Sequence, residues 1–402
     1  MFSLTQTHKT ILLFTAGIMA SMNGLFILLH SNGLGFDRFA KFSFISEPQD
    51  SLANTSLLVV VTTSLSTEEG YMESRLFYLD AIQRNFASLC EIGMTVRVKF
   101  TAYNDMDIRW KEYFNSTKGH CQREGSSFSL DLETFAYEKL PPEAFGTSGT
   151  LAMRHRDIFA REVENYDFFL IQEDDVNYTP ENIIYLISNY RRMSRLRPSL
   201  FPNVFDSEMV NGAHYATFRM NAGYIFRLQQ ELYFSSIHVP GGRGYLLPRI
   251  LLLRLIEQQG LHTFLNSQGV KGEFNPTIAS GQAIMANYNL VHPLRNWKSG
   301  AIHHMSNKYI KLEMERNQSD VLSSLQFNEL EEVFSSCYGP AESNKSSTTV
   351  SFEGSCWACL ESGHASYMST IIEGCPFSAE RKVTFKFICE ESENIRFPGR
   401  QD

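Results

Sequence analysis

The chain has 402 residues, of which 43% are hydrophobic and 20% are charged. This is the composition of an ordinary globular protein, with enough apolar residues for a sizeable core. The formal net charge of −8 at pH 7 argues against a nucleic-acid-binding protein, which requires a basic face. The length allows one large domain or two smaller ones.

Residues 11–29, ILLFTAGIMASMNGLFILL, form an apolar run without a charged residue. About 20 apolar residues span the hydrocarbon core of a bilayer, so the run is just long enough for a transmembrane helix. A cleaved signal peptide is the alternative, but it has a shorter apolar core and a small-residue cleavage site. Because the apolar run resumes at residues 25–29, we favour an uncleaved signal anchor at residues 11–30, with a cytoplasmic tail at residues 1–10.

Sequons and cysteines indicate on which side of the membrane the rest of the chain lies. Asn-x-Ser/Thr sequons begin at Asn54, Asn115, Asn177, Asn317 and Asn344. All seven cysteines follow the apolar run, and five of them lie between residues 337 and 389. Such clustering suits an oxidising compartment. We therefore expect a single-pass type II protein whose bulk is lumenal or extracellular.

The first elements predicted after the anchor form a βαβ unit. Residues 31–55 lack a sustained periodicity and are interpreted as a stem. Residues 56–64, SLLVVVTTS, predict a buried strand because they are continuous, apolar and β-branched. Residues 66–89 predict a helix, and residues 95–105 predict a second strand. The helical spacing is carried by Leu76, Leu79, Ile82 and Phe86. This order of elements is typical of a parallel sheet.

A further strand leads directly into three acids. Residues 149–166 predict a helix, and the apolar strand DFFLIQ follows at residues 167–172. The acids Glu173–Asp175 come next, with no Lys or Arg near them in sequence. Thr179 and Pro180 then predict a helix start, with Thr as the N-cap and Pro in the first helical position. In open α/β sheets ligands bind at the carboxyl ends of strands, so these acids mark a candidate site.

The C-terminal half has a less regular pattern. Residues 217–228 predict a strand, and residues 244–260 predict a helix that is interrupted near Pro248. Residues 341–351 are polar and predict a linker. Residues 355–389 predict a small disulfide-bonded appendage.

Carboxylates at the end of a strand can converge on a hard divalent cation, which prefers oxygen ligands and keeps positions open for substrate phosphates. A cation bound there neutralises the acids and stabilises the charge that develops on a departing nucleoside diphosphate. The alternative is that the three acids simply begin a solvated turn. The buried strand before them and the capped helix after them favour the metal site.

The same residues resemble a known family. A hydrophobic strand that ends in Glu173-Asp174-Asp175 and follows a βαβ start is similar to the DxD-type motif of GT-A glycosyltransferases. The anchor, the stem and a lumenal α/β domain resemble the organisation of Golgi glycosyltransferases. Residues 153–176 and 303–309 resemble a eukaryotic group of transferase-like proteins. The resemblance covers residues 56–310, and the motif reads Glu-Asp-Asp rather than Asp-x-Asp.

The resemblance implies an α/β fold with a GT-A-like mixed, mainly parallel sheet that is flanked by helices. The catalytic domain would comprise residues 56–335. An N-terminal transmembrane helix would precede it, and a small Cys-rich segment at residues 336–402 would follow. The implied location is the membrane of the Golgi or another secretory compartment, with the catalytic domain in the lumen.

The resemblance also implies a divalent cation, Mn²⁺ or Mg²⁺, and a role for each acid. Asp175 would ligate the metal ion, with Asp174 as a further candidate ligand. Glu173 or Asp174 would reach the ribose or a metal-bound water. A late His often supplies a further ligand in such enzymes, and a neutral imidazole is a competent one. His303 and His304 are the candidates, of which at most one would bind, and surface or core positions are the alternative.

Other residues would contact the nucleotide sugar. The nucleotide pocket would be lined by Thr62, Thr63 and Ser64 at the end of the first strand, by Asn104 and Asp105 after the second, and by Arg154 and Arg156 facing the diphosphate. Solvated helix positions are the alternative for the two arginines. Lys308 is a further candidate for a phosphate contact.

An inverting transferase needs a carboxylate that deprotonates the acceptor hydroxyl. Glu273 is the catalytic base that we favour, with Asp206 and Glu208 as the alternatives. A retaining mechanism would require none of them.

The clustered cysteines include a close pair, Cys356 and Cys359. The other members of the cluster are Cys337, Cys375 and Cys389. A lumenal location favours disulfides. A zinc site is the alternative, although only one close pair is present. A redox-active CxxC is less favoured because no βαβ pattern surrounds it.

The sequence thus predicts a metal-dependent glycosyltransferase that moves a sugar from a nucleotide-sugar donor to a glycan or glycoprotein acceptor. A non-catalytic lectin-like or surface recognition ectodomain on the same fold is the alternative. A different metal-dependent phosphotransferase would need a phosphate-binding glycine loop, and GGRG at residues 241–244 is too generic to indicate one.

Overall fold

The computed structural model describes residues 52–63, 65, 71–104, 106–117, 121, 123, 125–136, 151, 153–196, 200–210, 212–218, 222–228, 231–236, 244–266, 289–305, 323–336, 347–356 and 381–391. Residues 52–402 form one compact unit. The expected tail, anchor and almost all of the stem lie outside the described residues, as do Ser64, Asp105, Glu273 and Lys308. Within the described segments, no helix is long and apolar enough to cross a membrane.

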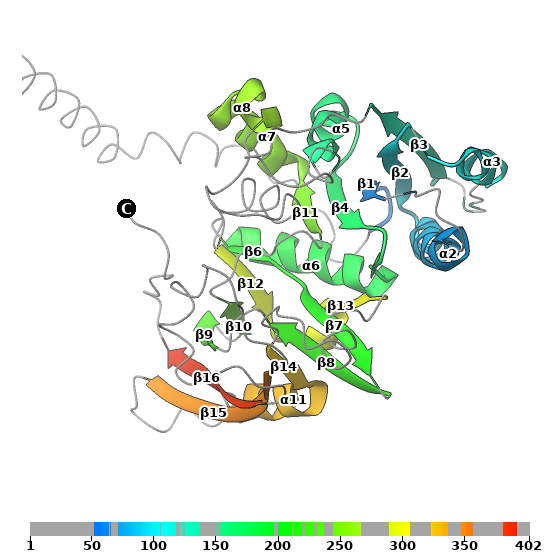
Figure 1. Cartoon of the computed structure of the whole chain (residues 1–402). Helices are drawn as coiled ribbons and strands as arrows, with labels where there is room; N and C mark the ends of the chain where they lie inside the picture. The colour runs from blue at the N-terminus through cyan, green and yellow to red at the C-terminus, as the bar shows by residue number, and fades with distance from the viewer. Residues whose placement is uncertain are drawn as a thin grey trace, which may run out of the picture. The chain divides into compact units, whose positions relative to one another are not determined.

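The first sheet has five strands in the order β11-β4-β1-β2-β3 (Figure 1). Its strands are β1 (Ser56–Thr62), β2 (Thr95–Tyr103), β3 (Phe128–Phe135), β4 (Phe168–Glu173) and β11 (Tyr245–Pro248). β1 pairs in parallel with both β2 and β4, β2 pairs in parallel with β3, and β11 is antiparallel to β4. The predicted α/β fold with a mixed, mainly parallel sheet is therefore confirmed.

Helices cover both faces of this sheet (Figure 1). One face packs against α2 (Tyr71–Glu91), α3 (Ile108–Ser116) and α6 (Pro180–Leu196), and the other against α5 (His155–Glu162), α7 (Arg249–Gln259) and α8 (Leu261–Asn266). Successive side chains of a strand point to opposite faces. Leu57 and Val59 therefore join the first core and Leu58 and Val60 the second. A strand that is buried on both faces explains the unbroken apolar run in the sequence.

The predicted start of α6 is confirmed in detail. The backbone N–H of Thr179 donates to the Asn182 side chain at 2.7 Å, and the backbone N–H of Asn182 faces the Thr179 hydroxyl at 3.4 Å. This exchange resembles a capping box with Asn in place of Glu. The Asn182 side chain also donates to the carbonyls of Ser299 and Ala301, at 2.8 and 3.0 Å. The helix start thereby fixes a distant segment that leads into β13 (Ala301–His304).

Eleven strands form the second sheet, in the order β5-β13-β7-β8-β14-β15-β16-β9-β10-β12-β6. In chain order they are β5 (Val176–Asn177), β6 (Leu200–Pro202), β7 (Phe205–Val210), β8 (Ala213–Phe218), β9 (Ala222–Leu228), β10 (Glu231–Ser236), β12 (Asn289–Pro293), β13, β14 (Ser323–Gln326), β15 (Ser347–Cys356) and β16 (Arg381–Glu391). Helix α11 (Phe327–Ser336) packs beside it through Leu330 and Val333.

Two predicted elements differ from the structure. Residues 217–228 are not one strand, because β8 ends at Phe218 and β9 begins at Ala222. Residues 244–260 begin with strand β11 rather than with a helix, and α7 starts only after Pro248. Pro248 has an extended backbone, and its ring prevents it from donating to a preceding turn, so it marks the strand-to-helix boundary.

The C-terminal segment was expected to form a linker and an appendage, but two of its stretches belong to the second sheet. β15 is antiparallel to β14 and β16, and β16 pairs in parallel with β9. β15 begins at Ser347, inside the expected linker of residues 341–351. The local sequence gave no sign of the pairing of β16 with β9, because β9 lies more than a hundred residues earlier. Cys337, Cys359 and Cys375 lie outside the described residues.

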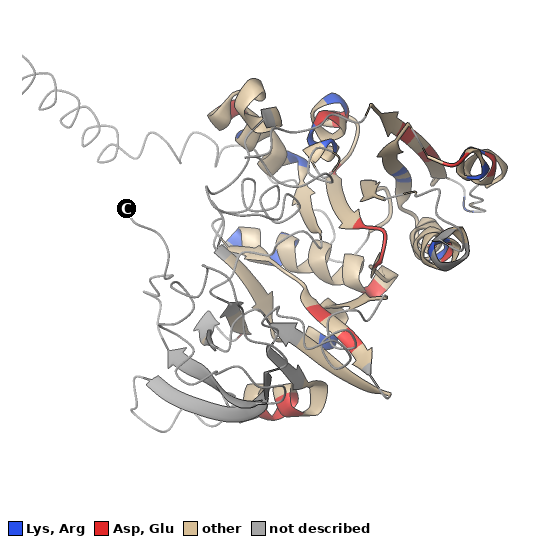
Figure 2. Ribbon diagram, in the orientation of Figure 1, with Lys and Arg blue, Asp and Glu red and all other residues tan. Residues whose placement is uncertain are grey.

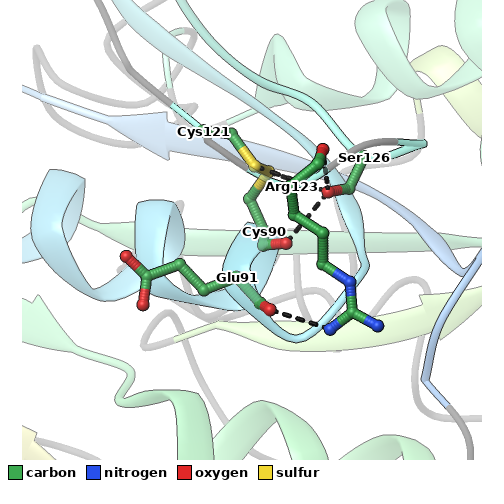
Figure 3. The surroundings of a disulfide bond; sticks show 5 residues. All are labelled: Cys90, Glu91, Cys121, Arg123 and Ser126. Atoms are coloured by element: carbon green, nitrogen blue, oxygen red, sulfur yellow. Dashed lines mark hydrogen bonds between the residues drawn. A yellow bond between two sulfur atoms is a disulfide. The ribbon is translucent and has the colours of Figure 1, made fainter.

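A disulfide joins Cys90 at the end of α2 to Cys121 in the segment before β3 (Figure 3). The Ser126 hydroxyl donates to the carbonyl of Cys90 at 3.0 Å, and the Arg123 side chain donates to the carbonyl of Glu91 at 2.9 Å. This disulfide does not involve the five cysteines between residues 337 and 389, for which the sequence predicted disulfides. It ties the connection between β2 and β3 to the end of a core helix.

We expect the double substitution Cys90→Ser/Cys121→Ser to lower the free energy of unfolding. The disulfide closes a loop with a sequence separation of 31 residues, and loss of such a loop constraint costs about 3–4 kcal/mol. Urea denaturation with and without a reductant measures the effect. Without a reductant the double variant should unfold at a lower urea concentration than the wild type, and a reductant should narrow this difference. Equal stability of the wild type under both conditions would contradict the assignment.

A buried histidine makes the stability of the fold sensitive to acid. The His292 ring stacks on Phe205, with ring centroids 4.0 Å apart, and on Phe234 at 5.6 Å. Burial disfavours the charged form and lowers the pKa of His292 from 6.5 to about 3. Between these values the unfolded chain binds a proton that the folded chain does not. Stability therefore falls as the pH drops below about 6.5.

We predict that His292→Phe flattens this dependence. In the wild type this group contributes a slope of about 1.4 kcal/mol per pH unit. The slope should be smaller by this amount in the variant between pH 6 and pH 4, because this range lies between the pKa of 6.5 and the lowered pKa of about 3. Denaturation midpoints at several pH values measure it, with exposed His214→Gln as the control. Identical slopes in the wild type and His292→Phe would contradict the prediction.

Candidate metal centre

The acids lie at the point where the order of the first sheet reverses. From β1 the chain continues to β2 and β3 on one side, and then crosses to β4 on the other side of β1. Thr62 at the end of β1 is directly opposite Glu173 at the end of β4. Ligands of open α/β sheets bind outside the carboxyl ends of the strands at such a reversal. The acids therefore occupy the position where this topology favours binding.

A tight turn carries Glu173–Asp175 out of the first sheet and into the second. The Gln172 side chain donates to the carbonyl of Val176 at 3.0 Å and bridges the turn from inside. β5 then pairs antiparallel with β13, so that Val176 is opposite His304. The backbone N–H of Met305 donates to the carbonyl of Asp175 at 2.7 Å. The turn is drawn in red at the end of β4 in Figure 2.

Three side chains converge at this turn. Ligand atoms of Glu173, Asp175 and His304 all lie within 4.8 Å of one another. Oxygen and nitrogen ligands of one hard cation are separated by no more than about 5 Å, because each bond is roughly 2.0–2.6 Å long. Asp175 is 4% exposed and His304 is 1% exposed, whereas Glu173 is half-buried. The three ligand atoms are therefore close enough to hold one metal ion, and Glu173 is the most exposed of the three residues.

His304 stands between two carboxylates. Its Nε2 atom lies 3.5 Å from Oδ2 of Asp175, and its Nδ1 atom lies 3.9 Å from Oε1 of Glu208. The imidazole therefore lies between two buried carboxylates, one facing each ring nitrogen. Buried carboxylates near one another repel, and a dication relieves that repulsion more fully than one proton does.

Asp174 is held by a different set of partners. Arg75, near the start of α2, forms an ion pair with it at 2.7 Å, and the Thr63 hydroxyl donates to it at 2.5 Å. Asp174 is therefore compensated in space, although no Lys or Arg lies near it in the sequence. Because Arg75 competes with a metal ion for this carboxylate, we assign Asp174 a structural role at the site. Its predicted role as a ligand stays untested.

The sequence did not point to Arg75, which is 99 residues before its partner. Its neighbours in α2 carry the helical pattern of the core, and an arginine near the first turn is ordinary. The part played by Gln172 was also missed. A glutamine at the end of an apolar strand is a weak signal, but a buried amide requires partners and so marks a place where the backbone turns.

The two threonines predicted for the nucleotide pocket lie at the same edge. The Oγ1 atom of Thr62 is buried and has no hydrogen-bond partner among the described residues. Thr63 is committed to Asp174 through its hydroxyl. Thr62 therefore offers a buried polar atom next to Glu173, whereas Thr63 supports the acidic turn.

The remaining nucleotide-pocket candidates are spread along the edge. Asn104 is exposed at the end of β2, and its backbone N–H donates to the carbonyl of Phe135 at 3.0 Å. The Arg154 guanidinium lies over the Phe135 ring, 5.5 Å from the centroid, and is partly exposed. Asn104 and the Arg154 guanidinium therefore lie near the carboxyl end of β3, which is separated from β4 by β1 and β2.

Arg156 is in the interior of the helix layer. It is fully buried, and its guanidinium donates to the carbonyl of Phe264 in α8 at 3.1 Å. Burial disfavours the charged form and lowers its pKa. This position links α5 to α8, so a diphosphate contact would require Arg156 to leave its partner.

The two histidines differ in how deeply they are buried, and so do the candidate bases on β7. His304 lies beside the acids. His303 is half-buried and pairs with Asn177, and its side chain points to the opposite face of the sheet from that of His304. Glu208 on β7 is 1% exposed, which leaves no room for an acceptor hydroxyl to reach it. Asp206 on the same strand is half-buried, and its role as a base remains a prediction.

We expect the neighbouring acids Asp175 and Asp174 to respond differently to substitution. Asp175→Asn should abolish stabilisation by Mn²⁺, because it removes a candidate ligand of the metal ion. Asp174→Asn should lower the metal-free stability by about 1–3 kcal/mol, because it leaves Arg75 without its carboxylate, and should keep the Mn²⁺ response. Thermal denaturation with Mn²⁺ or with EDTA measures both effects, and the reverse pattern would contradict the assignment.

The chain was compared with known proteins. No protein-family model matches it, and no curated protein sequence matches it at a significant level. Its functional interpretation therefore rests on the residues and the geometry described above.

Proposed function

We propose that this protein is a metal-dependent glycosyltransferase that moves a sugar from a nucleotide-sugar donor to a glycan or glycoprotein acceptor. The observation that carries the proposal is the convergence of Glu173, Asp175 and His304 at the reversal of the parallel sheet. The resemblance of the acidic motif to the DxD-type motif of GT-A glycosyltransferases indicates that the reaction is glycosyl transfer.

The residues present fit a bound Mn²⁺ or Mg²⁺ ion. Asp175, His304 and Glu173 would hold it, and it would stabilise the negative charge on a diphosphate leaving group. An oxygen-rich site with one imidazole suits such a cation, whereas a structural zinc site usually has four Cys or His ligands.

The chain itself would orient the donor. The buried Thr62 hydroxyl lies at the end of β1, in register with Glu173, and could bond a polar group of a nucleotide without losing a described partner. Arg75 and Thr63 hold Asp174 in place, and this fixes the turn from which Glu173 and Asp175 project. Partly exposed Arg154 at the same edge is a candidate for the diphosphate, in preference to buried Arg156.

The acceptor side of the reaction is less defined. Glu273, the favoured base, lies outside the described residues. Glu208 is too deeply buried to meet an acceptor. Asp206 therefore remains as the candidate base on β7, and a retaining mechanism would need none.

The proposed location is the lumen of the Golgi or another secretory compartment, with type II anchoring. It rests on the apolar residues 11–30 and on the sequons. The disulfide between Cys90 and Cys121 supports an oxidising compartment, because disulfides are rare in the cytosol. Exposed Asn54 and Asn115 are positions where a glycan would not disturb the fold.

We predict that a nucleoside diphosphate raises the melting temperature only when Mn²⁺ or Mg²⁺ is present. A panel of UDP, GDP and their sugar conjugates, each with cation or with EDTA, identifies the donor class. Slow hydrolysis of the matching nucleotide sugar should depend on the cation. It should fall by roughly 10²–10³-fold in Asp175→Asn, the usual effect of removing a major electrostatic contact.

Glu331→Gln serves as the control, because this exposed carboxylate belongs to α11 and pairs with Lys298. Its hydrolysis rate should stay within a few-fold of the wild type. Glycan binding that is unaffected by EDTA, without nucleotide binding, would favour a lectin-like module. Absence of any cation-dependent nucleotide binding would contradict the proposed function.

A further inference from the structure

Glu208 has an unusual position for an acid. It lies on β7 and is 1% exposed, and its Oε1 atom is 3.9 Å from Nδ1 of His304. The other ring nitrogen of His304 faces Asp175 at 3.5 Å. The imidazole is thus flanked by one carboxylate at the candidate metal centre and by another on the side of β7.

The backbone around His304 is held independently of its ring. β13 pairs in parallel with β7, with His303 opposite Ser207, and the Ser207 hydroxyl donates to the carbonyl of Ile302 at 2.9 Å. Gly300 precedes β13, and a Cβ atom there would lie 2.7 Å from the Tyr185 ring. These contacts fix the path of the β13 backbone. The orientation of the His304 ring depends instead on the side chains around it.

A histidine that binds a metal ion through one nitrogen carries its proton on the other. That N–H group needs an acceptor, which is very often a carboxylate, and the acceptor fixes both the tautomer and the orientation of the ring. The present separation of 3.9 Å is longer than a hydrogen bond, so a small rotation of either side chain would be needed to close it. Glu208 is the carboxylate that faces Nδ1.

We propose that Glu208 is a positioning residue for the metal centre: it accepts a hydrogen bond from Nδ1–H of His304 and holds Nε2 toward Asp175 and Glu173. This inference rests on the proposed function, because it concerns the same cation. It replaces the alternative that Glu208 is a catalytic base. The proposed role requires a hydrogen-bond acceptor at Glu208 but not a negative charge, so a glutamine should be able to replace the glutamate.

Mn²⁺ binding to the full-length protein tests this role without any assay of activity. Isothermal titration is carried out on the wild type, Glu208→Gln, Glu208→Leu and Glu208→Asp. The glutamine oxygen can still accept from Nδ1–H, so Glu208→Gln should bind within about threefold of the wild type. Loss of the acceptor in Glu208→Leu should weaken binding by about 10–100-fold. Glu208→Asp draws the carboxylate back by one methylene and should weaken binding similarly.

Met209→Gln is the matched control, because Met209 is the next residue on β7 and is exposed. Its Mn²⁺ affinity should equal that of the wild type. Circular dichroism establishes that each variant is folded, and Glu208→Asp replaces Glu208→Leu if the latter is not. Rescue by glutamine distinguishes positioning from a merely structural role, in which all three substitutions would act through stability.

The possible failures are separable. Wild-type affinity in both Glu208→Leu and Glu208→Asp, with binding still lost in Asp175→Asn, would overturn the role of Glu208 and leave the proposed function intact. An equal loss in Glu208→Gln and Glu208→Leu would overturn it as well, because the charge would then be what matters. No Mn²⁺ binding by the wild type would overturn the metal centre and this inference together.

Discussion

The pairing of β5 with β13 is the constraint on which the candidate site depends. It places Val176 opposite His304, and the adjacent bond from Met305 to Asp175 closes the contact. The turn at Glu173–Asp175 is the direct connection between a strand of the first sheet and a strand of the second. An imidazole from a late segment is thereby fixed beside acids from the middle of the chain, by main-chain bonds that do not depend on the acids themselves.

Two neighbouring aspartates illustrate how the environment divides their roles. Asp174 points to Arg75 and Thr63, which satisfy its charge and hold the turn. Asp175 faces His304, beyond which lies a second buried carboxylate, Glu208. A carboxylate that is paired with an arginine is already compensated, whereas two carboxylates beside one imidazole would be stabilised by a dication. This difference is the physical basis for assigning the metal ion to Asp175 rather than to Asp174.

Local patterns predicted what depends on neighbours in sequence. The apolar run of β1, the strand before the acids and the Thr179–Pro180 helix start were all confirmed, because burial and capping leave a periodic signal. Contacts between distant segments left none. Arg75 could not be paired with Asp174, the two-residue strand β5 was too short to predict, and the apolar residues before Pro248 suited a helix as well as a strand. The second sheet was missed for the same reason.

The most direct test of the account is the pulsed electron paramagnetic resonance spectrum of Mn²⁺ bound to the protein. The account predicts a nitrogen coupling from a directly bound imidazole, which disappears in His304→Gln and persists in His303→Gln. A bound Mn²⁺ ion without nitrogen coupling, or a coupling that depends on His303 instead, would contradict the assignment of Asp175 and His304 to one metal centre.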